Sequence, residues 1–310
     1  MSKMVALPGG AFRMGSDSSY PEEAPVVRVE VEPFEIDRGP VTCAEFAEFA
    51  AATGYVTVAE RAPDPAQFPG VDPSLLVPGS LVFTRTSGPV DLSDWRQWWS
   101  WRPGASWRRP YGPDSLILGR DDHPVVQVAY EDALAYATWA GKRLPTEAEW
   151  EFAARGGLDG AIYEWGDEPQ ATGALRANTW QGRFPYLNTG ANGWVGTSPV
   201  GSFPGNGYGL VDMTGNTWEW TSDYHTPNHD FLVRSASAPS CGCGPASRLT
   251  EASAEHGSGI PRRVLKGGSH LCAPEYCLRY RPAARSPQAE GSATTHIGFR
   301  CARSFGSAPG

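Results

Sequence analysis

The chain has 310 residues and a formal net charge of −8, from 34 Asp and Glu against 26 Lys and Arg. This balance excludes nucleic acid or an anionic membrane as the main partner, because both bind clustered Lys and Arg, and the sequence shows no such cluster. Its 36 glycines and 28 prolines predict a loop-rich body rather than a bundle of long helices.

The cysteine content and the apolar segments indicate the compartment. Six cysteines in 310 residues are too few and too irregularly spaced for a disulfide scaffold. No apolar run has the length of a signal peptide core or of a membrane span. We therefore expect a soluble, cytoplasmic protein with reduced thiols.

The first predicted elements are a strand and a helix. Residues 26–31 alternate in the period of two that is typical of a half-buried strand. Thr42 and Glu45 form a capping box, which predicts that a helix begins there. Gly54 can end this helix in the left-handed conformation.

Two further helices are predicted before the middle of the chain. The run 131–137 is helical in pattern and is followed by Gly141 as a stop signal. Thr146 and Glu149 form a second capping box, and the helix after them ends before Gly156.

The rest of the chain shows little periodicity. Residues 60–122 are irregular, and the tryptophans within 95–101 are expected to anchor long loops to the core. Residues 226–262 are rich in Ser, Ala and Gly and are expected to form a mobile insertion. Because we find no repeat and no boundary, the sequence predicts a single domain over 1–310.

Five short blocks occur in order along most of the chain. They are 141–151 (GKRLPTEAEWE), 206–210 (NGYGL), 215–220 (GNTWEW), 266–269 (KGGS) and 298–300 (GFR). In this order they resemble the formylglycine-generating enzyme family, also called the sulfatase-modifying factor family. The resemblance implies an irregular α+β fold of low secondary-structure content, related to C-type lectins. Fold alone does not imply activity, because relatives include enzymes of other chemistry and modules without catalysis.

Cys272 and Cys277 lie five positions apart, just after the Gly-Gly-Ser turn. Spacing alone leaves open a disulfide or two inert buried thiols. Within the block order, however, the pair resembles the working cysteines of catalytic members. Two thiolates without a further nearby ligand suit a soft monovalent ion, so we expect Cys272 and Cys277 to hold Cu(I).

The resemblance also implies a reaction. A cysteine of another protein is oxidised to C-alpha-formylglycine, with copper and O2 taking a hydrogen from its Cβ and an external thiol reductant supplying the remaining electrons. Ser269 and Tyr276 are expected to position oxygen or substrate, and Trp218 to form an apolar wall beside the metal.

The partner implied by the resemblance is an unfolded or nascent sulfatase segment of the type Cys-X-Pro-X-Arg. We expect it to bind in extended form in a surface cleft, with an acidic wall for its arginine. The enzyme itself is expected to be a monomer.

A calcium site is predicted around the block 215–220. Asp212 and Glu219 are seven positions apart and flank a glycine turn, which offers the oxygen ligands that Ca²⁺ prefers. By resemblance, the ligands are Asp212, Gly215, Thr217 and Glu219. A hydrogen-bonded loop without metal is the alternative.

A second structural calcium is implied by resemblance alone. Its ligands would be Asn178, Thr179, Asn192 and Trp194, partly through backbone oxygens. Asn192 stands where the family more often has Asp, so this site has one negative charge fewer. A loop without metal is again the alternative.

The other four cysteines have no catalytic prediction. Cys301 is expected to be a free core thiol and Cys43 to pack on the first helix. Cys241 and Cys243 lie in the expected insertion, where they could bind metal or be incidental. His296 stands where relatives often carry Asn, and it could tune the site or cap a turn.

Three alternative functions stay open at this stage. The first is a non-catalytic, calcium-stabilised lectin-like module of the same fold. The second is a related iron enzyme that forms C–S bonds, which the scattered histidines disfavour. The third is a metal-free version of the same oxidation, in which the cysteine pair acts by disulfide exchange.

Overall fold

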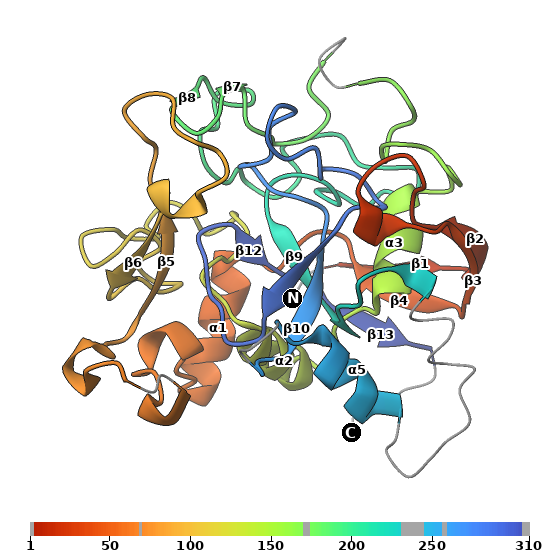
Figure 1. Cartoon of the computed structure of the whole chain (residues 1–310). Coiled ribbons are helices and arrows are strands. Elements are labelled where there is room, and N and C mark those ends of the chain that lie inside the picture. The colour runs from red at the N-terminus through yellow and green to blue at the C-terminus, as the bar shows by residue number, and fades with distance from the viewer. Residues whose placement is uncertain (1–2, 68–69, 170–173, 231–244, 256–258, 306–310) are drawn as a thin grey trace.

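The computed structural model describes residues 3–67, 70–169, 174–230, 245–255 and 259–305. A four-stranded sheet lies at the centre of the molecule (Figure 1). Its strands are β9 (Trp218–Tyr224), β10 (Arg262–Lys266), β11 (Arg285–Ala289) and β12 (Ile297–Gly298), in the order β11-β10-β9-β12. β9 and β10 are antiparallel, so the start of β9 lies beside the end of β10.

A second sheet joins the two ends of the chain. β4 (Phe34–Asp37) pairs with β1 (Met4–Leu7) on one edge and with β13 (Ala302–Ser304) on the other, both antiparallel. Three hairpins complete the strands: β2 (Gly10–Met14) with β3 (Val27–Val31), β5 (Gly79–Phe83) with β6 (Trp99–Pro103), and β7 (Gly182–Arg183) with β8 (Leu187–Asn188). The strand predicted over 26–31 is confirmed as β3.

The predicted helices are confirmed, with shifted bounds for one. α1 (Cys43–Thr53) carries both capping-box bonds of Thr42 and Glu45 and ends at Gly54 with φ of 69°. α2 (Tyr130–Trp139) begins before the predicted run, because the Asp132 carboxylate accepts the Ala129 N–H at 2.8 Å and caps the helix.

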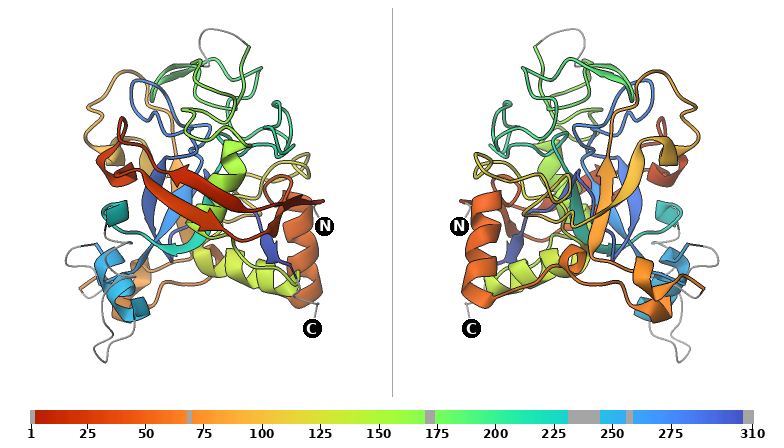
Figure 2. Two further views of the ribbon diagram at one scale, coloured as in Figure 1. Left: turned by 90° about the vertical axis from the view of Figure 1, so that its right-hand side faces the viewer. Right: turned by 90° about the vertical axis from the view of Figure 1, so that its left-hand side faces the viewer.

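α3 (Glu147–Arg155) has the second capping box and ends at Gly156 with φ of 56°. It packs against β2 and β3, and the hairpin of these strands crosses in front of it (left view of Figure 2). None of the helices in the described ranges is long and apolar enough to span a membrane.

Short 3-10 turns occur outside the longer helices, most of them in or next to the irregular region 60–122. They are η1 (Pro21–Glu23), η2 (Val58–Glu60), η3 (Pro65–Gln67), η4 (Pro73–Leu75) and η5 (Trp95–Gln97). Trp98 anchors its loop as predicted, since its side chain is only 2 % exposed. The prediction is wrong for Trp95 and Trp101, which are 51 % and 47 % exposed.

The segment 226–262 contains a further helix, α5 (Pro245–Ser253). Thr226 and His229 at its start are buried, and so is Ser253 at the end of α5. These three side chains tie the described parts of the segment to the body. Cys241 and Cys243 lie outside the described residues.

Candidate active site

Two loops meet at one end of the central sheet. The cysteine segment (residues 267–284) leaves the end of β10, and the carboxylate turn (residues 212–219) leads into the start of β9. Because these strands are antiparallel neighbours, the loops lie side by side. The Gly215 N–H donates to the Gly267 carbonyl at 2.8 Å, and the His270 N–H donates to the Asn216 carbonyl at 3.0 Å.

Two glycines open the cysteine segment. Gly267 has φ of 94° and Gly268 has φ of 71°, a region that side-chain-bearing residues rarely adopt. A Cβ at Gly267 would lie 2.6 Å from the Met213 carbonyl oxygen, and one at Gly268 would lie 2.8 Å from that of Arg279. The Gly-Gly sequence therefore lets the segment turn sharply against the carboxylate turn.

The structure brings the two predicted cysteines together. Their Sγ atoms are 3.1 Å apart and not bonded. Cys272 is 1 % exposed, whereas Cys277 is partly exposed. A compact turn sets this geometry, since the Cys272 N–H donates to the Ser269 carbonyl and the Cys277 N–H to the Ala273 carbonyl, at 2.9 and 2.6 Å.

The two thiols differ in acidity. A hydrogen bond from Cys272 lowers the pKa of Cys277, and the nearby Arg279 guanidinium lowers it further. Burial raises the pKa of Cys272 well above its usual value, and the neighbouring Cys277 adds to this. Cys277 is therefore the more acidic thiol of the pair, and Cys272 is the less acidic one.

The N-terminal part of the chain clamps the cysteine segment. Arg281 forms two hydrogen bonds to Glu23, at 2.9 and 2.6 Å, and both side chains are buried. Arg279 pairs with Glu22 at 2.5 Å, and its guanidinium lies 4.1 Å from the centre of the Tyr20 ring. Arg279 and Arg281 thus each have a carboxylate partner. These ion pairs hold a segment that lacks regular secondary structure.

Aromatic side chains pack against the cysteine segment. Tyr276 stacks on Phe184 with ring centroids 4.3 Å apart, and its ring meets Trp98 edge to face. The backbone N–H of Trp180 donates to the Cys272 carbonyl at 3.0 Å. Trp218 shares a core cluster with Cys272; its role as an apolar wall beside a metal stays a prediction.

Ser269 is fully buried in the same turn. Its Oγ accepts a hydrogen bond from the Leu271 N–H at 3.2 Å, and its own N–H donates to Cys272 Sγ at 3.4 Å. Ser269 thus positions the inner thiol directly. Contacts of Ser269 and Tyr276 with oxygen or substrate stay a prediction.

The carboxylate turn contains buried oxygens without a partner. Asp212 Oδ2 accepts the Gly201 N–H at 2.7 Å, but its Oδ1 has no hydrogen bond, and neither does Thr217 Oγ1. Burial raises the pKa of Asp212 to about 6. Unsatisfied buried oxygens of this kind suit a hard cation such as Ca²⁺.

Glu219 fits the predicted calcium less well. Its oxygens accept hydrogen bonds from Arg300 at 2.6 and 2.8 Å and from Trp150 Nε1 at 2.7 Å. A cation at the turn would have to share Glu219 with Arg300. Within the described residues, no three His, Cys, Asp or Glu side chains come together to hold a metal, so an ion here would rely on backbone and hydroxyl oxygens.

The second predicted calcium set is divided between core and surface. Asn178 is buried, and its Oδ1 has no partner, which suits a ligand. Asn192 and Trp194 are exposed, and the Trp194 carbonyl accepts the Ala191 N–H at 3.0 Å. The Asn178 carbonyl accepts the Asn216 N–H at 2.8 Å, which links this set to the carboxylate turn.

Sequence reasoning missed Glu164. Its Oε1 accepts from Thr214 Oγ1 at 2.7 Å, while its buried Oε2 has no partner. Burial raises the pKa of Glu164 to about 8, and the Asp212 charge adds to this. The only sequence signal is a carboxylate between Tyr163 and Trp165.

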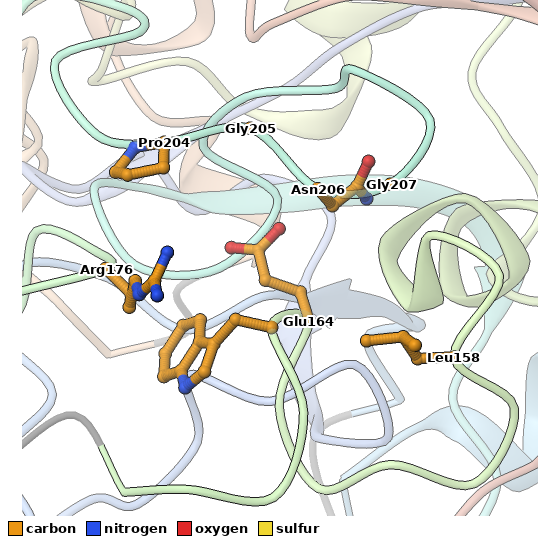
Figure 3. Close-up of a pocket in the computed structure, with 8 residues that line it drawn as sticks. Leu158, Glu164, Arg176, Pro204, Gly205, Asn206 and Gly207 are labelled. Atoms are coloured by element: carbon orange, nitrogen blue, oxygen red, sulfur yellow. The ribbon is translucent and has the colours of Figure 1, made fainter.

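Glu164 lines a pocket of about 300 Å³. Its carboxylate points into the space between Arg176 and Asn206, beneath Gly205 (Figure 3). The pocket is also lined by Trp165, Leu158, Pro204 and Gly207.

Three further residues singled out in the sequence are two cysteines of the core and the partly buried His296. Cys301 and Cys43 are buried free thiols, as predicted. His296 accepts the Trp218 N–H through its carbonyl at 2.8 Å, and its ring contacts Trp99 at 4.8 Å. His296 thus borders the apolar wall.

Comparison with known proteins assigns the fold. The family model described as a sulfatase-modifying factor enzyme 1-like domain matches residues 1–305. The chain belongs to the sulfatase-modifying factor family. The predicted irregular α+β architecture is thereby confirmed.

Members of this family differ in whether they are named as active. The formylglycine-generating enzyme of Mycobacterium tuberculosis is 62% identical over 301 residues, with 97% of each chain covered. A Bos taurus protein named inactive C-alpha-formylglycine-generating enzyme 2 is 39% identical, covering 99% of this chain and 90% of its own. The solved structure of PvdO from Pseudomonas aeruginosa has a TM-score of 0.63 at 28% identity, covering 98% and 95%.

Proposed function

We propose that this protein is a formylglycine-generating enzyme that oxidises a cysteine of a sulfatase, within a Cys-X-Pro-X-Arg segment, to C-alpha-formylglycine. The observation that carries the proposal is the unbonded cysteine pair, with Sγ atoms 3.1 Å apart at the edge of the core. The 62% identity to a protein named for this activity supports it. Since the family also has a member named inactive, the pair and its electrostatics matter more than the fold.

The donor set suits Cu(I). Two sulfurs without a third ligand side chain favour a soft monovalent ion, and the described residues bring no further His, Cys, Asp or Glu to the pair. When bound by Cys272 and Cys277, copper would supply the O2 activation and one-electron chemistry that side chains lack.

The residues of the chain prepare the pair for this role. Cys277 is the more acidic thiol, because Cys272 and Arg279 both lower its pKa. Cys272 is the buried thiol that releases its proton when a cation binds. The Ser269 N–H and the Trp180 N–H hold its sulfur and carbonyl in place.

Exclusion of water is the second task of the site. Trp218 lies in the core cluster of Cys272, and Tyr276 of the cysteine segment packs against Trp98 and Phe184. A dry surrounding protects a reactive intermediate from side oxidation. The substrate thiol approaches from the side of Cys277, since that cysteine is the exposed one.

The electron count requires a further reductant. Conversion of –CH2–SH to an aldehyde releases two electrons and H2S, whereas O2 accepts four electrons on its way to water. Two equivalents of an external thiol, oxidised to a disulfide, provide the other two. A reducing compartment such as the cytoplasm would supply that thiol and also keep Cys43 and Cys301 free.

We assign structural calcium to the carboxylate turn. Asp212 Oδ1 and Thr217 Oγ1 are the unpartnered oxygens that a cation would satisfy there. Gly215 offers its carbonyl, and Glu219 shares its oxygens with Arg300. For the second site, Asn178 Oδ1 is the best-placed ligand.

The deciding experiment incubates the purified protein with Cu(I), O2, a thiol and a Cys-X-Pro-X-Arg peptide. Mass spectrometry should show a loss of about 18 Da at the cysteine, the difference between –CH2–SH and –CHO. A parallel sample with a Cu(I) chelator separates the copper reaction from disulfide exchange without metal. Absence of the product in every sample would leave only the non-catalytic interpretation.

A further inference from the structure

Three aromatic rings form a continuous stack between the cysteine pair and the surface pocket of Glu164. Tyr280 and Tyr163 are stacked with centroids 5.9 Å apart and an interplanar angle of 21°. Tyr163 and Trp165 are stacked at 4.9 Å and 2°. Both distances lie in the range of direct ring contact.

The inner end of the stack lies beside the thiols. Tyr280 is buried, follows Cys277 by three positions and shares a core cluster with Cys272. Burial raises its pKa, and charge on Tyr163 and on both cysteines raises it further. The clamp of Arg281 on Glu23 fixes the backbone that carries this ring.

The outer end of the stack reaches solvent. Trp165 lines the pocket of about 300 Å³ and is partly exposed. A tight turn makes the stacking possible, because the Tyr163 N–H donates to the Gly166 carbonyl at 2.9 Å and Gly166 returns a bond at 3.2 Å. This turn places the rings of Tyr163 and Trp165 face to face, while Glu164 between them points into the pocket.

Packing alone would be served by any large apolar side chains. Here all three rings belong to the two residue types that are readily oxidised by one electron. Their ring contacts also form a chain that runs from the site of the proposed oxygen chemistry to a solvent-accessible pocket. We propose that Trp165, Tyr163 and Tyr280 carry single electrons from a small thiol at the surface to the cysteine pair. This inference rests on the proposed function, because that reaction needs two electrons beyond those of the substrate.

The electron balance is as follows. An electron moves from Tyr280 to the oxidised cysteine centre. Tyr163 then reduces the Tyr280 radical, and Trp165 reduces the Tyr163 radical. Each tyrosine releases its phenolic proton to water on oxidation and regains one on reduction. The Trp165 radical is reduced by the electron of an S–H bond, and the proton goes to solvent. Two such events per product yield two thiyl radicals, which combine to one disulfide.

The test compares Tyr163→Phe with Tyr136→Phe. Both substitutions keep a stacked, buried ring and remove only the phenolic hydroxyl group. Tyr136 lies in the same core cluster but stacks on Phe46, which is not readily oxidised. One measurement omits the substrate: the copper-loaded enzyme is exposed to O2 at limiting thiol, and oxidised residues are mapped by peptide mass spectrometry. The other follows formylglycine formation at limiting thiol.

Wild type and Tyr136→Phe should collect oxidation at Trp165. Tyr163→Phe should lose that signal and show damage at Tyr280 or Cys277 instead. Its rate of product formation at limiting thiol should fall at least about tenfold, the effect of a barrier higher by about 1.4 kcal/mol. Trp165→Phe should behave like Tyr163→Phe.

The proposal is overturned if Tyr163→Phe matches Tyr136→Phe in the oxidation map and in thiol dependence. Failure of the proposed function is a different result, since wild type would then form no formylglycine at any thiol concentration. In that case the oxidation map, which needs no substrate, still decides whether electrons pass along the stack.

Discussion

The cysteine segment and the carboxylate turn are neighbouring loops that are held in different ways. In the cysteine segment, Arg279 and Arg281 each have a carboxylate partner from the N-terminal part of the chain. In the carboxylate turn, Asp212 and Thr217 each keep a buried oxygen without a partner. Carboxylates of the protein pair both arginines in the first loop, whereas the second loop keeps acceptor oxygens that no protein donor satisfies.

This difference indicates a division of labour. A loop whose arginines are held by ion pairs can keep two reactive thiols at a fixed distance before any ligand binds, which is the preorganisation that catalysis requires. A loop with unsatisfied carboxylate oxygens gains order when a cation arrives. We therefore expect changes in the cysteine segment to act on activity or on the fold directly, and changes in the turn to act through calcium.

The largest expected effect is on catalysis. Cys277→Ser removes one of the two sulfurs of the pair, so formylglycine formation should fall by more than about 100-fold, beyond the loss typical for residues around a metal ligand. Its melting temperature should stay close to wild type, because Cys277 is partly exposed. Peptide mass spectrometry and thermal unfolding check both statements. Substantial product from Cys277→Ser would contradict the assigned role.

The next effect is on the fold. Arg281→Ala leaves Glu23 buried and unpaired, which should lower the free energy of unfolding by about 3–5 kcal/mol. Arg303→Ala is the matched control, because its pair with Glu35 lies at the surface and should contribute at most about 1 kcal/mol. Denaturant unfolding measures both. Equal losses in the two variants would show that the clamp is not what holds the cysteine segment.

Calcium removal tests the other loop. Ca²⁺ at about 100 times its dissociation constant should stabilise the protein by about 2.7 kcal/mol, and a chelator should reverse this. Asp212→Asn should abolish the response, because it replaces the carboxylate whose Oδ1 is unpartnered. Asp159→Asn, which alters an exposed pair with Arg13, should leave it unchanged. A melting temperature independent of calcium in wild type would refute the proposed site.

The parts of this structure that the sequence predicts are those fixed by neighbouring residues. The capping boxes at Thr42 and Thr146 and the glycines that end both helices act within a few positions, so their helices were predictable. The Gly-Gly turn with Cys272 and Cys277 is local in the same sense, and its motif identified the site.

The parts that could not be predicted depend on distant contacts. Arg281 and Glu23 are 258 positions apart, and no local pattern marks either as a partner. Glu164 meets Thr214 over 50 positions, and its unpartnered oxygen is visible only in three dimensions.

The smallest predicted effect concerns pH and again separates the two loops. His225 directly follows β9. The charged groups that act on it belong to Arg285, Glu147, Arg262 and Arg279. Burial, followed by the Arg285 charge, lowers the pKa of His225 to about 3. The unfolded chain has an ordinary histidine, with a pKa of about 6.5, and so binds more protons between these values. Stability should therefore fall as the pH falls through this window.

From pH 7 to pH 5, His225 should contribute a loss of about 2 kcal/mol, at about 1.4 kcal/mol for each pH unit below 6.5. His225→Gln removes the titrating group, so its free energy of unfolding should depend less on pH by that amount, whatever other histidines contribute. Denaturant unfolding at pH 7, 6 and 5 gives the difference between the two proteins. If the free energies of unfolding of the two proteins depended on pH in the same way, His225 would have the same pKa in the folded and unfolded chain. Burial and the Arg285 charge would then not disfavour its protonated form.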